Sequence, residues 1–133
     1  MKKIISIVLV IVWMIVIFIL SNEDASKTTD TTNFILKLFG INSNTFLFIL
    51  IRKLAHFSEY LILGLLLHNM FNKFEINNNY ILISICIIYA CSDEIHQLFI
   101  KGRNCSIIDV LIDTLGSILY IFIYKIKNKL LKN

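Results

Sequence analysis

The chain has 133 residues, enough for one domain at most, and 57% of them are hydrophobic. Its 13 lysines and arginines against 9 aspartates and glutamates give a formal net charge of +4, and these few charges are clustered. A soluble domain of this size must cover its surface with charge, so the composition excludes one and predicts an integral membrane protein. The cations lie mostly beside apolar segments, which favours membrane topology signals over nucleic-acid binding.

The first predicted element is an apolar helix over about 4–20. Lys2 and Lys3 precede it, as basic residues also precede the core of a signal peptide. The apolar run is close to the length that spans a bilayer, and the sequence 21–25 offers no small-x-small cleavage site. We therefore expect an uncleaved transmembrane helix.

A polar stretch, 21–33, separates this helix from the short apolar segment 34–40. The apolar segment is too short to span a membrane. We expect it to form one or two helical turns in the membrane interface that end at Gly40.

Three further apolar segments follow, at about 45–70, 80–100 and 106–124. Each is long enough to cross a hydrocarbon core of ~30 Å. The loops between them, 72–79 and 101–105, are short. The expected fold is therefore all-α, with four transmembrane helices in a small bundle that forms one domain over 1–133.

Two local features refine this bundle. Ser106 and Asp109 have the spacing of a capping box that opens the last helix. Gly64 and Gly116 are predicted to be points of close helix packing.

The lysines predict the orientation in the membrane. If both ends of the chain are cytoplasmic, the inner loops and ends carry more cations than the outer loops, as the positive-inside rule requires. We therefore expect N-in, C-in topology. The inner cations are Lys2, Lys3, Lys73, Lys125, Lys127, Lys129 and Lys132, and the outer ones are Lys27, Lys37, Lys101 and Arg103.

Polar side chains interrupt the apolar segments at three places that this topology brings to one depth, in the outer half of the membrane. At about 100° per residue, Arg52, His56 and Glu59 share one helix face, and Asp109 and Asp113 share another. Charged groups in a bilayer are expensive unless they face one another or a cavity. The expected pocket is lined by Arg52, Lys53, His56, Glu59, Asp93, Glu94, Gln97, Arg103, Asp109 and Asp113.

Carboxylates outnumber the fixed cations in this set. Protonated histidines, a protonated carboxylate or a bound cation would balance the charge. Ion pairs that only fix helix register are the structural alternative. A loose metal site from His56, Glu59, Glu94 and His96 is conceivable, but its spacing is unlike that of common metal sites, and we expect no metal and no cofactor.

These blocks resemble the signatures of VanZ-like membrane proteins. The resemblance rests on Arg52-Lys53-x-x-His56-x-x-Glu59-Tyr60, Asp93-Glu94-x-x-Gln97 and Gly102-Arg103-x5-Asp109-x3-Asp113-x2-Gly116, and it covers nearly the whole chain. The family usually has proline where Lys101 stands and asparagine where Asp113 stands. The resemblance implies a bacterial integral membrane protein of a family whose founding member is linked to low-level teicoplanin resistance.

Three functions remain open at this point. The first is binding or shielding, in which Arg52, Lys53 and Arg103 hold the anionic part of a lipid-linked cell-wall precursor or lipoglycopeptide beside membrane lipids. The second is a membrane enzyme acting on such a ligand. The third is a structural module that binds a partner. The candidate catalytic residues of the enzyme are His56, Glu59, Asp93, Glu94 and His96.

Overall fold

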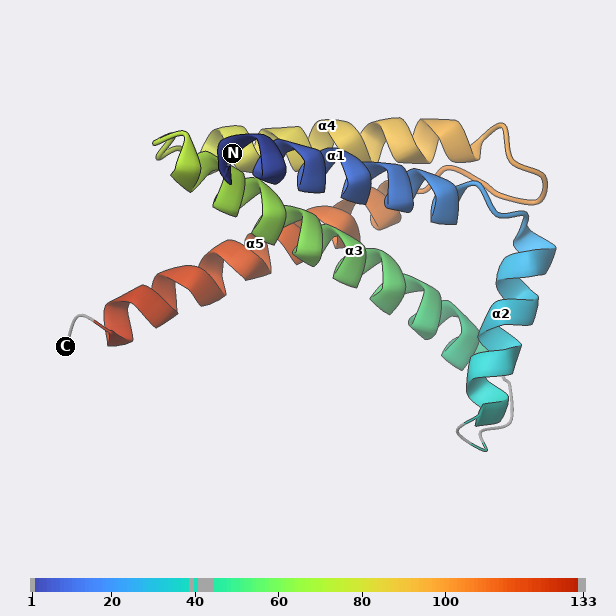
Figure 1. Cartoon of the computed structure of the whole chain (residues 1–133). Helices are drawn as coiled ribbons and strands as arrows, with labels where there is room; N and C mark the ends of the chain where they lie inside the picture. The colour runs from blue at the N-terminus through green and yellow to red at the C-terminus, as the bar shows by residue number, and fades with distance from the viewer. Residues whose placement is uncertain (1, 39, 41–44, 132–133) are drawn as a thin grey trace.

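The computed structural model describes residues 2–38, 40 and 45–131, and these residues form helices and turns without a strand. The helices are α1 (Lys2–Ser21), α2 (Ala25–Leu38), α3 (Thr45–Lys73), α4 (Asn79–Gln97) and α5 (Ile107–Leu130) (Figure 1). The all-helical fold is as expected.

Four of the helices pack on one another, and α2 stands apart at one end. Helices α1 and α4 run side by side, α3 crosses them, and α5 crosses α3 (Figure 1). The described ends of α1 and α5, at the two termini, lie at the same end of the molecule. At the opposite end α2 projects from α1 and contacts α3. The α4–α5 loop returns near the junction of α1 and α2, which brings three distant parts of the sequence together.

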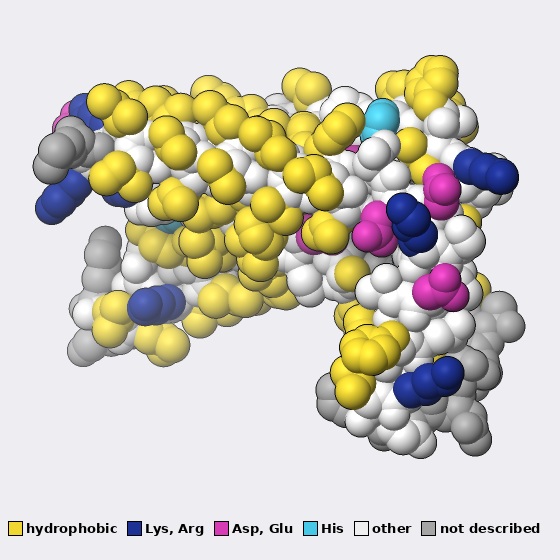
Figure 2. Space-filling model, turned by 45° about the vertical axis from the view of Figure 1, so that its right-hand side comes forward, with side chains coloured by type: hydrophobic (Ala, Val, Ile, Leu, Met, Phe, Trp, Pro, Cys, Tyr) yellow, Lys and Arg dark blue, Asp and Glu magenta, His cyan; other side chains and the backbone are white. Residues whose placement is uncertain are grey.

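The core is apolar, but so is most of the outer surface. Buried side chains such as Ile17, Leu63 and Leu82 are fully enclosed between α1, α3 and α4. Large apolar side chains also cover the outside, where Figure 2 shows an almost continuous hydrophobic surface over the helices. A surface of this kind suits contact with lipid and not with water.

Two of the described helices, α1 and α5, are long and apolar enough to cross a membrane by length and composition. Helices α3 and α4 were also expected to cross it, but they do not meet the same criterion. They carry the charged and amide side chains of the predicted pocket, which lower their hydropathy. The structure thus supports a membrane protein with two candidate spanning helices.

Helix α2 begins earlier than the short helix expected over 34–40. It starts at Ala25, and threonine hydroxyl groups within it donate hydrogen bonds to carbonyl oxygens one turn back. Thr29 bonds to Ala25 at 2.7 Å, and Thr32 bonds to Thr28 at 2.8 Å. Gly40 follows with φ +66°, the left-handed conformation that glycine adopts beyond helix ends.

Helices α3 and α5 approach closely at two glycines, as expected. A Cβ atom at Gly116 would clash with the backbone carbonyl oxygen of Phe57, and one at Gly64 would lie 3.2 Å from the Cα atom of Ser117. This close approach positions the site, because Asp113 lies one turn before Gly116 and is pressed against α3.

Candidate functional site

Polar side chains from α3, α4, α5 and the α4–α5 loop meet inside the bundle, toward the end at which α1 joins α2. Each is 9% exposed or less, and Asp113 is completely buried. The three sequence blocks therefore converge in space, although about 60 residues separate the first from the last. The buried residues are His56, Asp93, Glu94, Gln97, Arg103 and Asp113.

Gln97 links the carboxylates to the rest of the site. Its amide nitrogen donates to Asp93 Oδ2 at 3.2 Å and to Ser21 Oγ at 3.0 Å. Its amide oxygen accepts a hydrogen bond from Arg103 at 3.4 Å. Asp93 and Gln97 share a face of α4, as their spacing of four predicts.

Arg103 joins the α4–α5 loop to α1 and α2. Its Nε donates to the backbone oxygen of Glu23 at 3.1 Å, and its Nη2 donates to Thr28 Oγ1 at 2.9 Å. Burial lowers the pKa of this guanidinium, but an arginine in a protein stays charged. Its three bonds are thus charge-assisted and tie the loop firmly in place.

The first turn of α5 is capped differently from the predicted capping box. Ser106 does accept the backbone N–H of Asp109 at 3.3 Å. The Ser106 N–H donates a hydrogen bond to the Glu94 carboxylate of α4, at 2.7 Å, and not to Asp109 as a capping box would require. The Asp109 carboxylate pairs instead with Lys53 of α3, at 2.5 Å. Glu94 and Lys53 reach this turn because α4 and α3 pack against it. The spacing of residues along α5 does not reveal these contacts between helices.

The deepest part of the site combines one imidazole with two carboxylates. His56 Nδ1 lies 3.7 Å from Asp113 Oδ1. One ligand-type atom from each of His56, Asp93 and Asp113 lies within 4.8 Å of the others. Of the metal site considered from the sequence, only His56 belongs to this group.

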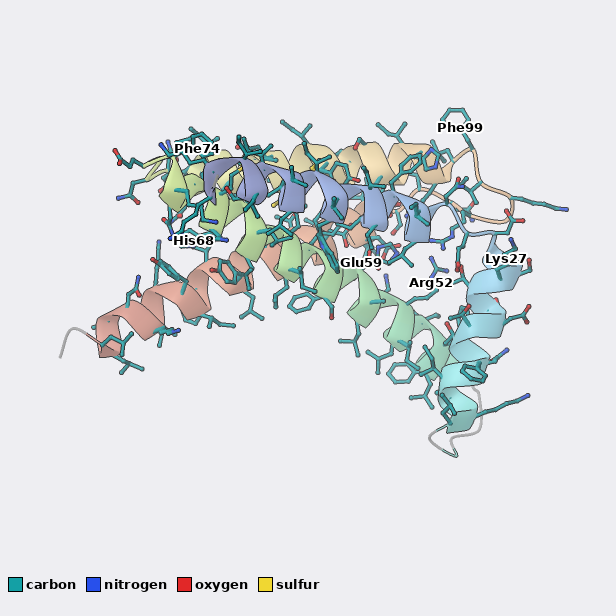
Figure 3. The ribbon with its side chains drawn as sticks, viewed as in Figure 1. Lys27, Arg52, Glu59, His68, Phe74 and Phe99 are labelled. Carbon is teal, nitrogen blue, oxygen red and sulfur yellow. The ribbon has the colours of Figure 1, made fainter. Side chains whose placement is uncertain are left out.

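A pocket of about 140 Å³ opens beside this cluster, between the end of α1, α2 and α3. Arg52, His56 and Glu59 line it from α3, and Figure 3 shows Arg52 on the side of α3 that faces the start of α2. The other lining residues are Leu20, Ser21, Glu23, Thr28, Thr31, Thr32, Ile35, Ile51, Ala55 and Arg103. A hydrated head group can enter a space of this size, since one water needs on the order of 10–15 Å³.

Arg52 stands at the boundary between this pocket and a smaller one. The second pocket, of about 90 Å³, is lined by Ile49, Arg52, Lys53, His56 and Asp109. Among the described residues, no carboxylate lies within ion-pair distance of the Arg52 guanidinium. Its charge is therefore available to a ligand in either pocket.

Two of the predicted site residues lie at the margin of the buried cluster. The His96 ring packs on Phe18, with ring centroids 4.5 Å apart, and its Nε2 lies 3.3 Å from Asn22 Oδ1. Glu59 is partly buried and lines the larger pocket from α3. His96 thus contacts the end of α1 and is not among the three grouped donors.

Helix α2 contributes site residues that the sequence blocks did not indicate. Thr28 accepts a hydrogen bond from Arg103, and Thr28, Thr31 and Thr32 line the larger pocket. The spacing of Thr28, Thr32 and the apolar Ile35 and Leu36 was a signal for a helix face. The polar composition of 21–33 nevertheless favours a connecting loop over a helix.

The described residues form helices, two of which are long and apolar enough to span a membrane. Their outer surface is apolar, and a polar cluster is buried inside the bundle. These features define a small helical membrane protein. The family model described as VanZ/LLP1 matches residues 6–128, and the chain belongs to this family. The resemblance seen in the sequence blocks is thereby confirmed. No curated protein and no solved structure matches the chain significantly.

Proposed function

We propose that this protein crosses the membrane four times, through α1, α3, α4 and α5, with both ends cytoplasmic. In the outer half of the bilayer its pocket binds or shields the anionic head group of a lipid-linked envelope component or of a lipoglycopeptide. By this binding it contributes to resistance to glycopeptides such as teicoplanin.

The observation that carries the proposal is the free charge of Arg52. The other two cationic side chains of the expected pocket have partners, since Lys53 bonds to Asp109 and Arg103 to three acceptors. Arg52 is partly buried between two pockets, and no carboxylate pairs with it among the described residues. A guanidinium in this setting is suited to a phosphate or carboxylate, which it can bind through two hydrogen bonds.

The threonines of α2 support a polar ligand. Thr28, Thr31 and Thr32 supply hydroxyl groups to the pocket wall opposite Arg52. Leu20, Ile35 and Ile51 line it as well, so apolar and polar surfaces meet at the same opening. This combination suits a head group that is attached to a lipid chain.

The arrangement of the chain supports the orientation. The described ends of α1 and α5 lie at one end of the molecule, and the polar cluster lies at the other (Figure 1). An even number of crossings accounts for this placement. The pocket residues Arg52 and Lys53 aside, more of the described cationic residues belong to the end with the termini than to the opposite end, as expected for the cytoplasmic side. They are Lys2, Lys3, Lys73, Lys125, Lys127 and Lys129 at the first end, and Lys27, Lys37, Lys101 and Arg103 at the other.

The enzyme alternative rests on one contact. His56 lines both pockets and lies 3.7 Å from Asp113, a pairing that can orient an imidazole as a general base. Under this alternative the protein would chemically modify the bound ligand, and the mass of the ligand would change.

Binding to Arg52 is tested with the full chain in detergent micelles. The probes are a lipid with a phosphate monoester head group, a phosphatidylcholine with the same acyl chains, and teicoplanin, with affinity measured by native mass spectrometry. We expect Arg52→Gln to weaken binding of the phosphate lipid and of teicoplanin by roughly tenfold or more, since hydrogen bonds to charged groups contribute about 1.5–3 kcal/mol. Arg52→Lys should give an intermediate loss, because a lysine keeps the charge without the planar fork.

The matched control is Lys37→Gln, which removes one positive charge from the exposed surface of α2. It should bind like the wild-type chain. Equal affinities for all four chains would contradict the binding site, and so would equal affinity of the wild-type chain for phosphatidylcholine and for the phosphate-monoester lipid. A changed ligand mass after incubation would favour the enzyme, and unchanged teicoplanin susceptibility in cells that express the wild-type chain would contradict the resistance role.

A further inference from the structure

Several polar atoms of the buried cluster lack a hydrogen-bond partner. Both carboxylate oxygens of Asp113, one oxygen each of Asp93 and Glu94, and the Nδ1 atom of His56 are buried and unpaired. Asp113 is 0% exposed, Glu94 1% and Asp93 3%. Buried polar groups in proteins are almost always satisfied, so this concentration of unpaired atoms requires a physical explanation.

The basic side chains nearby do not donate hydrogen bonds to these unpaired atoms. Arg103 points its nitrogens at Gln97, Thr28 and the backbone of Glu23, and Lys53 pairs with Asp109. Within the part of the chain that the structure describes, the only ion-pair partner of the Asp93 and Asp113 carboxylates is the imidazole of His56, which lies beside Asp113. Buried charges that lack a side-chain partner are commonly those that coordinate a metal ion.

The unpaired atoms are also spaced as metal ligands. A donor atom from each of His56, Asp93 and Asp113 lies within 4.8 Å of the others. Two ligands on opposite sides of one ion are roughly 4 Å apart, because metal–nitrogen and metal–oxygen bonds are about 2.0–2.2 Å long. A small side-chain adjustment would bring all three donors onto one ion.

The surroundings of these donors resemble the outer shell of a metal site. Gln97 donates to Asp93 Oδ2 and leaves Asp93 Oδ1 unpaired. Hydrogen bonds of this kind hold a ligand in orientation while its other oxygen coordinates. His56 lines both pockets, so an ion has a route to the donors and a coordination position can remain open toward the larger pocket.

We propose that His56, Asp93 and Asp113 form a binding site for one divalent metal ion. One imidazole with two carboxylates, and no thiolate among the three, suits Zn²⁺ or Mn²⁺ better than the all-oxygen preference of Ca²⁺ and Mg²⁺. The site lies behind the pocket of Arg52 and does not depend on the ligand proposed for that pocket. It departs from the sequence-based expectation that no metal binds, and it uses a different set of residues from the loose set first considered.

The site is tested with the full chain in detergent, stripped with a chelator and dialysed against Zn²⁺ or Mn²⁺. We expect elemental analysis to find about one ion per chain, and the bound ion to raise the unfolding temperature. Asp113→Asn and His56→Gln should each weaken binding by roughly tenfold or more, since the first replaces an anionic ligand by a neutral amide of the same shape and the second removes the imidazole. Circular dichroism and size-exclusion chromatography show whether each variant keeps its helices.

The matched control is Asp30→Asn, which removes the same charge from the exposed surface of α2. Asp30 lies outside the three grouped donors and lines neither of the two pockets beside them. It should bind the ion like the wild-type chain. If Asp113→Asn does not fold, the pair His56→Gln and Asp30→Asn decides the question.

Two results would overturn the proposal. One is that the stripped wild-type chain takes up neither Zn²⁺ nor Mn²⁺ in stoichiometric amount. The other is that the ligand variants bind as well as the control. Either result would mean that protons shared between the carboxylates, and not a metal ion, neutralise the cluster. Because no lipid is present, neither result bears on binding at Arg52.

Discussion

Arg103 holds together three parts of the chain that local interactions leave separate. It reaches α1 through the carbonyl oxygen following that helix, α2 through a threonine, and α4 through Gln97. Its planar group supplies donors in three directions, which a single ammonium cannot reproduce. At the scale of single residues, Arg103 therefore serves mainly to hold the elements around the site in place and less to neutralise the carboxylates.

We expect Arg103→Lys to lower the stability of the fold by about 1–3 kcal/mol, because it leaves acceptors near Glu23 and Thr28 unpaired. The unfolding temperature in detergent measures this effect. Lys101→Gln is the control, since Lys101 is exposed in the same loop. Similar unfolding temperatures for both variants would show that the loop is held by other contacts.

A second residue, Asp113, adds a buried carboxylate to the site. It stands where the resembled family usually has asparagine, and it is completely buried beside His56. An asparagine would remove one negative charge from the cluster while keeping the side-chain shape. The extra carboxylate therefore adds to the capacity of this chain for a bound cation.

At the scale of helices, the α3–α5 contact decides how deep the site lies. Gly116 packs its backbone against Phe57, and Ser117 lies against Gly64. The hydroxyl of Ser117 also donates to the carbonyl oxygen of Tyr60 at 3.3 Å. The close approach contributes to the complete burial of Asp113.

We expect Gly116→Ala to destabilise the protein by about 1–3 kcal/mol, because the new methyl group would push α5 away from the backbone of α3. Leu115→Ala is the matched control, since Leu115 is exposed on the outer face of α5. Thermal unfolding monitored by circular dichroism distinguishes the two. An unfolding temperature of Gly116→Ala equal to that of Leu115→Ala would contradict close packing at this point.

At the scale of the whole molecule, charge and apolar surface are separated. Apolar side chains cover the long helices, whereas charged side chains gather toward the two ends of the molecule, on one side around the junction of α1 and α2 and along α2 (Figure 2). This distribution fits a bundle whose apolar middle contacts lipid and whose charged ends lie at the membrane surfaces. It makes the orientation testable.

We expect Cys105, which is exposed in the α4–α5 loop, to react in intact cells with a maleimide that does not cross membranes. With Cys105→Ser as background, Glu75→Cys in the α3–α4 turn should react only after the membrane is permeabilised, because that turn lies at the opposite end. Labelled protein resolved by gel electrophoresis gives the readout. Reaction of Glu75→Cys alone in intact cells would mean that the orientation is reversed.

The sequence by itself determined the class and the family of this protein. A high apolar content with clustered charges can only be reconciled with a lipid environment, and ordered blocks of polar residues identified the family. Helical spacing also predicted that Asp93 and Gln97 would meet and that Gly64 and Gly116 would be packing points. These features depend on composition or on neighbours along one helix.

Only the tertiary structure decided which polar groups pair and which do not. Glu94 caps α5, Lys53 takes Asp109, and α2 supplies threonines to the pocket, because each contact joins helices whose mutual rotation no spacing rule specifies. The same packing leaves Arg52 free at the pocket and leaves His56 and Asp113 without enough partners. Pairing across helices depends on how closely backbones can approach, and that is set jointly by all the side chains of the core.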